Sequence, residues 1–131
     1  GLVGVETAEF LEEQGKEVTI VEMLDNIAQE MGFLRKQLTM QYIQEKNINI
    51  ITGAKLQAVK DDKLILATEE DKTKTINDIN SVIVAVGSIS HNPLQEFVEQ
   101  SDYKLHKIGD VVEPRSALEA IWEAEELAQN I

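Results

Sequence analysis

Hydrophobic residues in the N-terminal part of the chain alternate between helical spacing and short continuous runs. Helical spacing predicts one helix over residues 2–14, which Gly15 is suited to end, and a second over residues 33–46. Residues 18–21 and 48–51 form nearly continuous apolar runs, as expected of strands covered on both faces. Helices that alternate with such strands predict a parallel sheet.

One face of each of these helices is expected to contribute to the core. Residues 23–31 are predicted to form an irregular connection before the second helix, with Gly32 at its end. The positions expected on the apolar faces are Val5, Ala8, Phe10, Leu11, Leu34, Leu38, Tyr42 and Ile43.

The pattern changes to alternation between residues 52 and 80. Polar and apolar residues exchange every second position, which predicts antiparallel strands with a turn at Asp61-Asp62 and a tip at residues 69–72. Residues 81–87 are again continuously apolar and end in glycine, so a buried strand over 82–86 is expected to join the parallel sheet.

The remaining chain predicts shorter elements. Pro93 is suited to begin a short helix that runs to Glu99, and residues 105–108 are expected to form a last strand. A helix over residues 116–130 begins with a capping-box pattern. Its expected apolar face comprises Leu118, Ile121, Trp122 and Ala128, with Trp122 in the core. Its expected solvated face carries Glu119, Glu123, Glu125 and Glu126.

Composition excludes several classes of function. The chain has 131 residues, 43% of them apolar, which is enough for a core, and no apolar run approaches the ~20 residues that span a bilayer. A net charge of -12 argues against nucleic acid and anionic membrane as partners. Without cysteine the chain has no disulfide or thiolate metal site, which is compatible with a reducing cytoplasm, the expected location.

The first residues resemble the second half of a dinucleotide-binding turn. Gly1-Leu2-Val3-Gly4 would supply the last two glycines of G-x-G-x-x-G, and a helix and an apolar strand that ends in Glu22 follow. In such a turn the helix start faces a pyrophosphate, and the acid about 20 residues on binds a ribose. The strand that precedes this turn in a Rossmann unit is expected to lie upstream of Gly1, which leaves an open edge beside residues 18–21.

Three blocks of sequence together resemble a known family. These are residues 1–8 with 18–22, then Val84-Ala85-Val86-Gly87, and then Ile108-Gly109-Asp110 followed by Glu113-Pro114-Arg115. They resemble the C-terminal region of NADH:flavin oxidoreductases of the enoate reductase, 2,4-dienoyl-CoA reductase and trimethylamine dehydrogenase type. This region is built like the pyridine nucleotide disulfide reductases, and the resemblance covers the whole chain.

The resemblance implies an α/β fold with two parts. Residues 1–87 would be a Rossmann-like, three-layer NAD(H)-binding domain that lacks its first strand and carries an antiparallel three-stranded insertion. Residues 88–104 would connect it to residues 105–131, a returning segment of an FAD-binding domain. The FMN barrel and iron–sulfur cluster found in such proteins would lie outside this chain, as would the adenosine side of the FAD site.

The resemblance also implies which residues bind cofactors. Asp110 would hydrogen-bond the flavin ribityl chain, and the following helix start would face the isoalloxazine. The full set of expected cofactor-binding residues is Gly1, Leu2, Val3, Gly4, Glu22, Gly87, Gly109 and Asp110.

Other candidate residues have simpler interpretations. Glu6 is expected to pack or cap, Arg115 to be a surface cation, and His91 and His106 to be loop or edge residues. The sequence indicates no catalytic residue of its own, because it has neither a nucleophile–histidine–acid order nor a carboxylate pair for hydrolysis. It also indicates no metal site, since it has no cysteine and its two histidines are not near one another in sequence.

Two functions remain open at this stage. In the first, the chain is the NADH-binding part of an FAD-dependent NADH:flavin oxidoreductase. This enzyme would accept hydride from NADH and pass the electrons through FAD to a substrate site outside this chain, where an enoate or dienoyl-CoA is reduced. The chain alone would then be inactive, its partners would be NADH, FAD and the rest of its polypeptide, and a homo-oligomer is compatible with it. In the second, the region is a non-catalytic scaffold that holds an adenine nucleotide, as in trimethylamine dehydrogenase-like flavoproteins.

Overall fold

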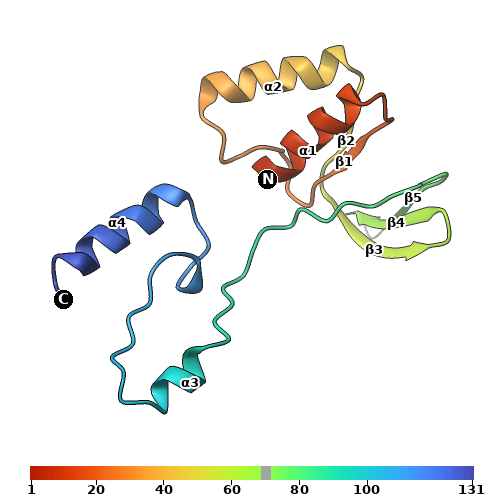
Figure 1. The fold of residues 1–131 in the computed structure, drawn as a ribbon. Helices are drawn as coiled ribbons and strands as arrows, with labels where there is room; N and C mark the ends of the chain where they lie inside the picture. The colour runs from red at the N-terminus through yellow and green to blue at the C-terminus, as the bar shows by residue number, and fades with distance from the viewer. Residues whose placement is uncertain (69–71) are drawn as a thin grey trace. The chain divides into compact units, whose positions relative to one another are not determined.

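The computed structural model describes residues 1–68 and 72–131, which form two compact units, Gly1–Val86 and Gly87–Ile131 (Figure 1). Residues 69–71 of the expected strand tip lie outside the described residues. None of the helices in the described ranges combines the length and the apolar character that a bilayer crossing requires. The predicted roles of the two parts in binding NAD(H) and FAD remain predictions.

The first unit begins with two helices that alternate with two parallel strands. Its elements are α1 (Leu2–Glu13), β1 (Thr19–Val21), α2 (Phe33–Glu45) and β2 (Asn49–Ile51). The strands pair in parallel, with Ile20 opposite Ile50. Gly15 follows α1 with φ +72°, the left-handed conformation that glycine adopts without strain. The predicted order of helices and strands is confirmed here.

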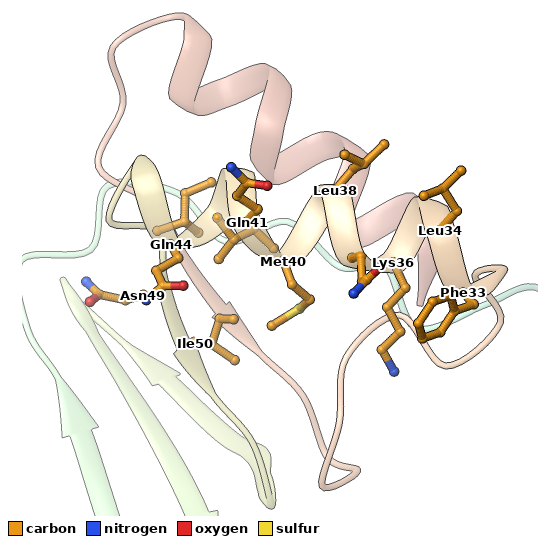
Figure 2. Close-up of a pocket in the computed structure, with 12 residues that line it drawn as sticks. Phe33, Leu34, Lys36, Leu38, Met40, Gln41, Gln44, Asn49 and Ile50 are labelled. Carbon is orange, nitrogen blue, oxygen red and sulfur yellow. The ribbon is translucent and has the colours of Figure 1, made fainter.

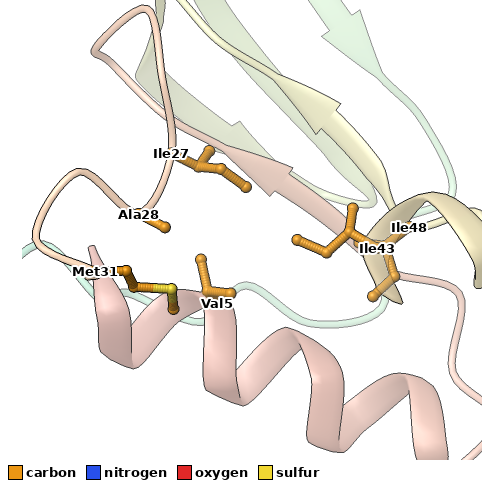
Figure 3. Close-up of a cluster of buried hydrophobic side chains, with 6 residues drawn as sticks. All are labelled: Val5, Ile27, Ala28, Met31, Ile43 and Ile48. Atoms are coloured by element: carbon orange, nitrogen blue, oxygen red, sulfur yellow. The ribbon is translucent and has the colours of Figure 1, made fainter. Parts of the chain in front are cut away.

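The core of this unit lies among α1, α2 and the connection between β1 and α2. Val5 of α1 meets Ile43 of α2 and Ile48, and the connection contributes three further buried side chains (Figure 3). Those three are Ile27, Ala28 and Met31. The connection is irregular as predicted, but it is anchored by its own apolar residues, which fixes its path past the start of α1.

A three-stranded antiparallel meander follows, as predicted. It consists of β3 (Ala54–Lys60), β4 (Lys63–Thr68) and β5 (Thr73–Ile76), with β4 in the centre. The β3–β4 turn lies at Asp61, and the register shifts between Leu56 and Ala58, where β3 bulges. A second core cluster holds the meander to the parallel strands. It contains Ala54, Leu64 and Leu66, packed against Val21, Ile51, Ile76 and Ile79. The two sheets, together with α1 and α2, confirm the α/β class.

The predicted parallel strand over residues 82–86 is wrong for this structure. The segment has no ladder partner in the described residues, and Val84 and Val86 are 70% and 89% exposed. A strand is defined by its hydrogen-bonded neighbour, so an apolar run without a neighbour stays irregular. Ala85 does approach α1, because a Cβ placed on Gly4 would lie 3.4 Å from the Ala85 Cβ.

The helix faces are also less buried than the spacing predicts. Phe10 of α1 and Leu34 and Leu38 of α2 are between 60% and 68% exposed, although Val5, Ala8 and Ile43 are buried as expected. Spacing identifies an apolar face, whereas burial of that face needs another element against it.

The second unit contains α3 (Gln95–Glu99), the 3₁₀ turn η1 (Gly109–Val111) and α4 (Ala117–Ala128). The capping box is confirmed, because the Ser116 hydroxyl accepts from the Leu118 N–H and the Glu119 carboxylate accepts from the Ser116 N–H. The predicted strand over residues 105–108 is absent from this described segment, which has no strand partner. Trp122, expected in the core, is 59% exposed, as nothing described covers that face of α4.

Candidate functional site

The start of α1 brings together three of the predicted cofactor-binding positions, Gly1, Leu2 and Glu22, and one further acid, Glu30. The Gly1 nitrogen lies 3.4 Å from Oε2 of Glu22, which directly follows β1. The Leu2 N–H donates to Oε2 of Glu30 at 3.2 Å. The first turn of a helix carries N–H groups without helical partners and a positive dipole end, so anionic groups are favoured there.

Glu22 is held in place by the backbone around it. Its side chain is only 19% exposed, and its Oε1 accepts from the Leu24 N–H at 3.1 Å. Partial burial acts to raise the pKa of Glu22, but hydrogen bonds from the Leu24 N–H and the Gly1 amino group outweigh it, and the pKa is lowered. The carboxylate therefore stays ionised at neutral pH, with a fixed position beside the helix start.

Glu30 is a residue that the sequence interpretation missed. It lies in the irregular connection 28 positions after Leu2, and a Cβ placed on Gly1 would lie 3.4 Å from its Oε2. Its neighbours Ala28 and Met31 are buried, so the core anchors this stretch beside α1. An acid in a connection carries no local signal of this contact. Only the anchoring apolar residues Ile27, Ala28 and Met31 could have suggested it.

The predicted cofactor-binding positions Val3, Gly4 and Gly87 differ from one another. Val3 is 68% exposed on α1. Gly4 faces Ala85, and a Cβ placed on Gly4 would lie 3.4 Å from the Ala85 Cβ, an ordinary van der Waals distance. Gly87, in the second unit, adopts φ +96°, which an L side chain rarely takes, and a Cβ there would meet nothing within 4 Å.

Polar contacts tie α1 to α2. Glu6, expected to pack or cap, forms an ion pair with Arg35. The Tyr42 hydroxyl donates to Oε2 of Glu12 at 2.9 Å, and Lys46 Nζ lies 3.6 Å from the same oxygen. Desolvation and the neighbouring Glu12 carboxylate raise the pKa of Tyr42 to about 12. The Arg35 guanidinium is thus paired with Glu6 across the two helices.

In the second unit, the predicted flavin residues lie in η1. Gly109 is buried with φ +65°, and a Cβ on it would lie 3.4 Å from the Ala120 Cβ of α4. Asp110 follows and is exposed. Glu123, expected on the solvated face of α4, instead accepts a hydrogen bond from the Gly109 N–H at 2.6 Å and pairs with Arg115. The expectation of a solvated Glu123 is therefore corrected, whereas Arg115 is exposed, as expected of a surface cation, and pairs with Glu123.

A groove lies between α2 and β2 (Figure 2). Met40 and Ile50 extend into this groove, and Phe33 and Lys36 line one end of it. None of the predicted cofactor-binding residues lines this groove. We therefore consider two separate candidate sites, one at the start of α1 in the first unit and one at η1 in the second.

A helix start with two small residues, followed by a strand that ends in a fixed acid, is the arrangement of dinucleotide-binding βαβ units. Residues 1–124 match the family described as pyridine nucleotide-disulphide oxidoreductase. The chain belongs to this family.

Individual relatives agree with this assignment. Cinnamate reductase of Clostridium sporogenes is 34% identical over the whole chain, and NADH oxidase of Thermoanaerobacter brockii is 31% identical over the whole chain. The structure of 2-naphthoyl-CoA reductase with 2-naphthoyl-CoA superposes with a TM-score of 0.82 at 26% identity, over 97% of this chain and 19% of that one. The expected resemblance to the NADH:flavin oxidoreductases of the enoate reductase type is confirmed. The chain spans about one fifth of the length of the curated relatives it matches.

Proposed function

We propose that this chain is the NADH-binding part, with the returning FAD segment, of an FAD-dependent NADH:flavin oxidoreductase. The observation that carries the proposal is the position of the Glu22 carboxylate. It is ionised and lies 3.4 Å from the nitrogen of Gly1, the residue directly before α1. This position supports a ribose-binding role for Glu22, beside the helix start that would face the pyrophosphate.

The residues around the start of α1 fit a dinucleotide. Gly1 has no side chain and is exposed directly before α1, so phosphate oxygens can approach backbone N–H groups there, and Glu22 offers a hydrogen-bond acceptor for ribose hydroxyls. The Glu30 carboxylate accepts the hydrogen bond of the Leu2 N–H in this structure. It must therefore move aside, or share that N–H, when a pyrophosphate binds there. The roles of Leu2 and Val3 would be to present their backbone N–H groups.

The residues of η1 fit the ribityl part of a flavin. Asp110 is exposed directly after a buried glycine whose left-handed conformation an L side chain rarely adopts. An exposed carboxylate at this position is suited to accept hydrogen bonds from sugar hydroxyls. When bound, FAD supplies acceptance of hydride and onward transfer of electrons, while the protein contributes binding and orientation.

We further propose an unsaturated acyl compound as the substrate of the whole protein. Two of the similar proteins carry the names cinnamate reductase and 2-naphthoyl-CoA reductase, and cinnamate is an enoate. This substrate site, together with any FMN and iron–sulfur cluster, would lie outside the present chain, which has no cysteine to ligate a cluster.

The test is anaerobic addition of NADH to the full-length protein while the flavin absorbance is followed. We expect the flavin to bleach with NADH and to recover when an enoate such as cinnamate is added. Reduction without recovery would contradict only the substrate proposal.

The alternative is the non-catalytic scaffold. It predicts that the full-length protein binds adenine nucleotides, that NADH leaves its flavin oxidised, and that a chemical reductant still bleaches that flavin. This result would refute NADH as the electron donor and leave nucleotide binding intact.

A further inference from the structure

The turn that carries Asp110 is attached to α4 by one carboxylate. The Gly109 N–H donates to Oε2 of Glu123 at 2.6 Å, across 14 positions of sequence. Gly109 is buried, and a buried N–H without an acceptor costs about 1–3 kcal/mol. Glu123 therefore satisfies a donor that the turn itself cannot satisfy.

The second oxygen of Glu123 connects the same carboxylate to the segment between η1 and α4. It pairs with the Arg115 guanidinium, whose Nε also donates to the Glu113 carbonyl at 3.3 Å. The Gly109 N–H, and next Arg115, lower the pKa of Glu123, so the carboxylate stays ionised at neutral pH. Both oxygens are thus used inside the unit, although 26% of the side chain is exposed.

Gly109 also lies close to α4 at Ala120. It adopts φ +65°, and a Cβ there would lie 3.4 Å from the Ala120 Cβ, one helical turn before Glu123. The turn is therefore close to α4 at Ala120 and attached to it by the hydrogen bond from the Gly109 N–H to Glu123. The residue next to this double attachment is Asp110.

We propose that Glu123 is a positioning residue for flavin binding. It fixes the Gly109 N–H, and through it the direction in which Asp110 presents its carboxylate to the ribityl hydroxyls. The proposal rests on the proposed function, in which Asp110 contacts FAD. Glu123 itself does not touch the cofactor in this scheme.

The experiment compares FAD dissociation constants of the full-length protein, measured by titration of the apoprotein. Glu123→Ala is expected to raise the Kd about tenfold, which corresponds to about 1.4 kcal/mol. Glu123→Gln keeps an oxygen for the Gly109 N–H and should stay within about threefold of the wild type. Glu126→Ala, which removes an exposed acid from the same helix, is the matched control and should leave the Kd unchanged.

Two further variants keep the test decisive. Glu123→Asp keeps the charge but withdraws the carboxylate from Gly109, so it should weaken FAD binding more than Glu123→Gln does, even if the alanine variant does not fold. If Glu123 acts through Asp110, the Asp110→Ala/Glu123→Ala double variant should bind FAD no more weakly than Asp110→Ala alone.

The outcomes separate the two proposals. An Asp110→Ala variant with the wild-type FAD Kd would refute the flavin role of this turn. If Asp110→Ala weakens FAD binding but Glu123→Asp and Glu123→Ala do not, or if Glu123→Gln weakens it as much as they do, the positioning role of Glu123 is overturned while the proposed function stands.

Discussion

Replacing Glu22 by alanine is expected to change which nicotinamide cofactor the protein prefers. The Glu22 carboxylate is ionised and held by the Leu24 N–H at 3.1 Å, so it cannot turn away freely from a ligand beside α1. It can accept hydrogen bonds from both ribose hydroxyls of NADH, whereas in NADPH it would face the negative 2′-phosphate. Met23 and Leu24, which follow, offer no positive charge, and Arg35 is engaged by Glu6.

The size of the expected preference depends on the distance between the Glu22 carboxylate and the 2′-phosphate of NADPH, and on the exposure of the Glu22 side chain. Two like unit charges about 4 Å apart repel by about 4 kcal/mol at the effective dielectric of a protein surface. Because 19% of the Glu22 side chain is exposed, water and salt screen part of this repulsion. We take about 1.4–2 kcal/mol as the remaining difference, which corresponds to a preference for NADH of roughly 10- to 30-fold.

The assay is flavin reduction by NADH and by NADPH in the full-length protein, with the apparent Kd of each cofactor taken from the concentration dependence. Glu22→Ala should narrow or reverse the preference, chiefly through tighter NADPH binding. Glu17→Ala, which removes an exposed acid just before β1, should keep the wild-type ratio. Equal affinity for the two cofactors in the wild type, or a Glu22→Ala variant with an unchanged ratio, would refute the ribose role of Glu22.

Two further predictions concern the core and the helix start. Leu66→Ala removes a side chain with 0% exposure from β4 and should lower the unfolding free energy by about 2–5 kcal/mol in urea denaturation. Leu56→Ala, at a 40% exposed position of β3, should cost less than about 1 kcal/mol, and equal losses would contradict the assigned core. Glu30→Gln keeps an acceptor for the Leu2 N–H but removes a negative charge that competes with the pyrophosphate, so the NADH Kd should fall about two- to fivefold in equilibrium titration. Asp25→Asn, in the same connection, is its control, and an unchanged Kd in Glu30→Gln would mean that Glu30 does not face the dinucleotide.

The sequence by itself determined the elements whose signals are local. The extents of α1 and α2, the end of α1 at Gly15 and the capping box at Ser116 were all predicted, because each depends on residues within one or two helical turns. The three-stranded meander was predicted as well, since alternation and polar turns are read from neighbouring positions. Glu22 could be singled out in the same way, from its place at the end of an apolar run.

Tertiary structure alone decided what depends on a distant partner. Residues 82–86 carry every local sign of a strand, yet without a hydrogen-bonded neighbour in the described structure they form none. The contacts of Glu30 with Leu2 and of Glu123 with Gly109 span 28 and 14 positions, and both acids appear in the sequence as ordinary solvated residues. Their partners are backbone N–H groups, which every residue but proline possesses, so no residue type marks them in advance. Packing brings these particular N–H groups and carboxylates within hydrogen-bond distance, and that proximity is a property of the fold.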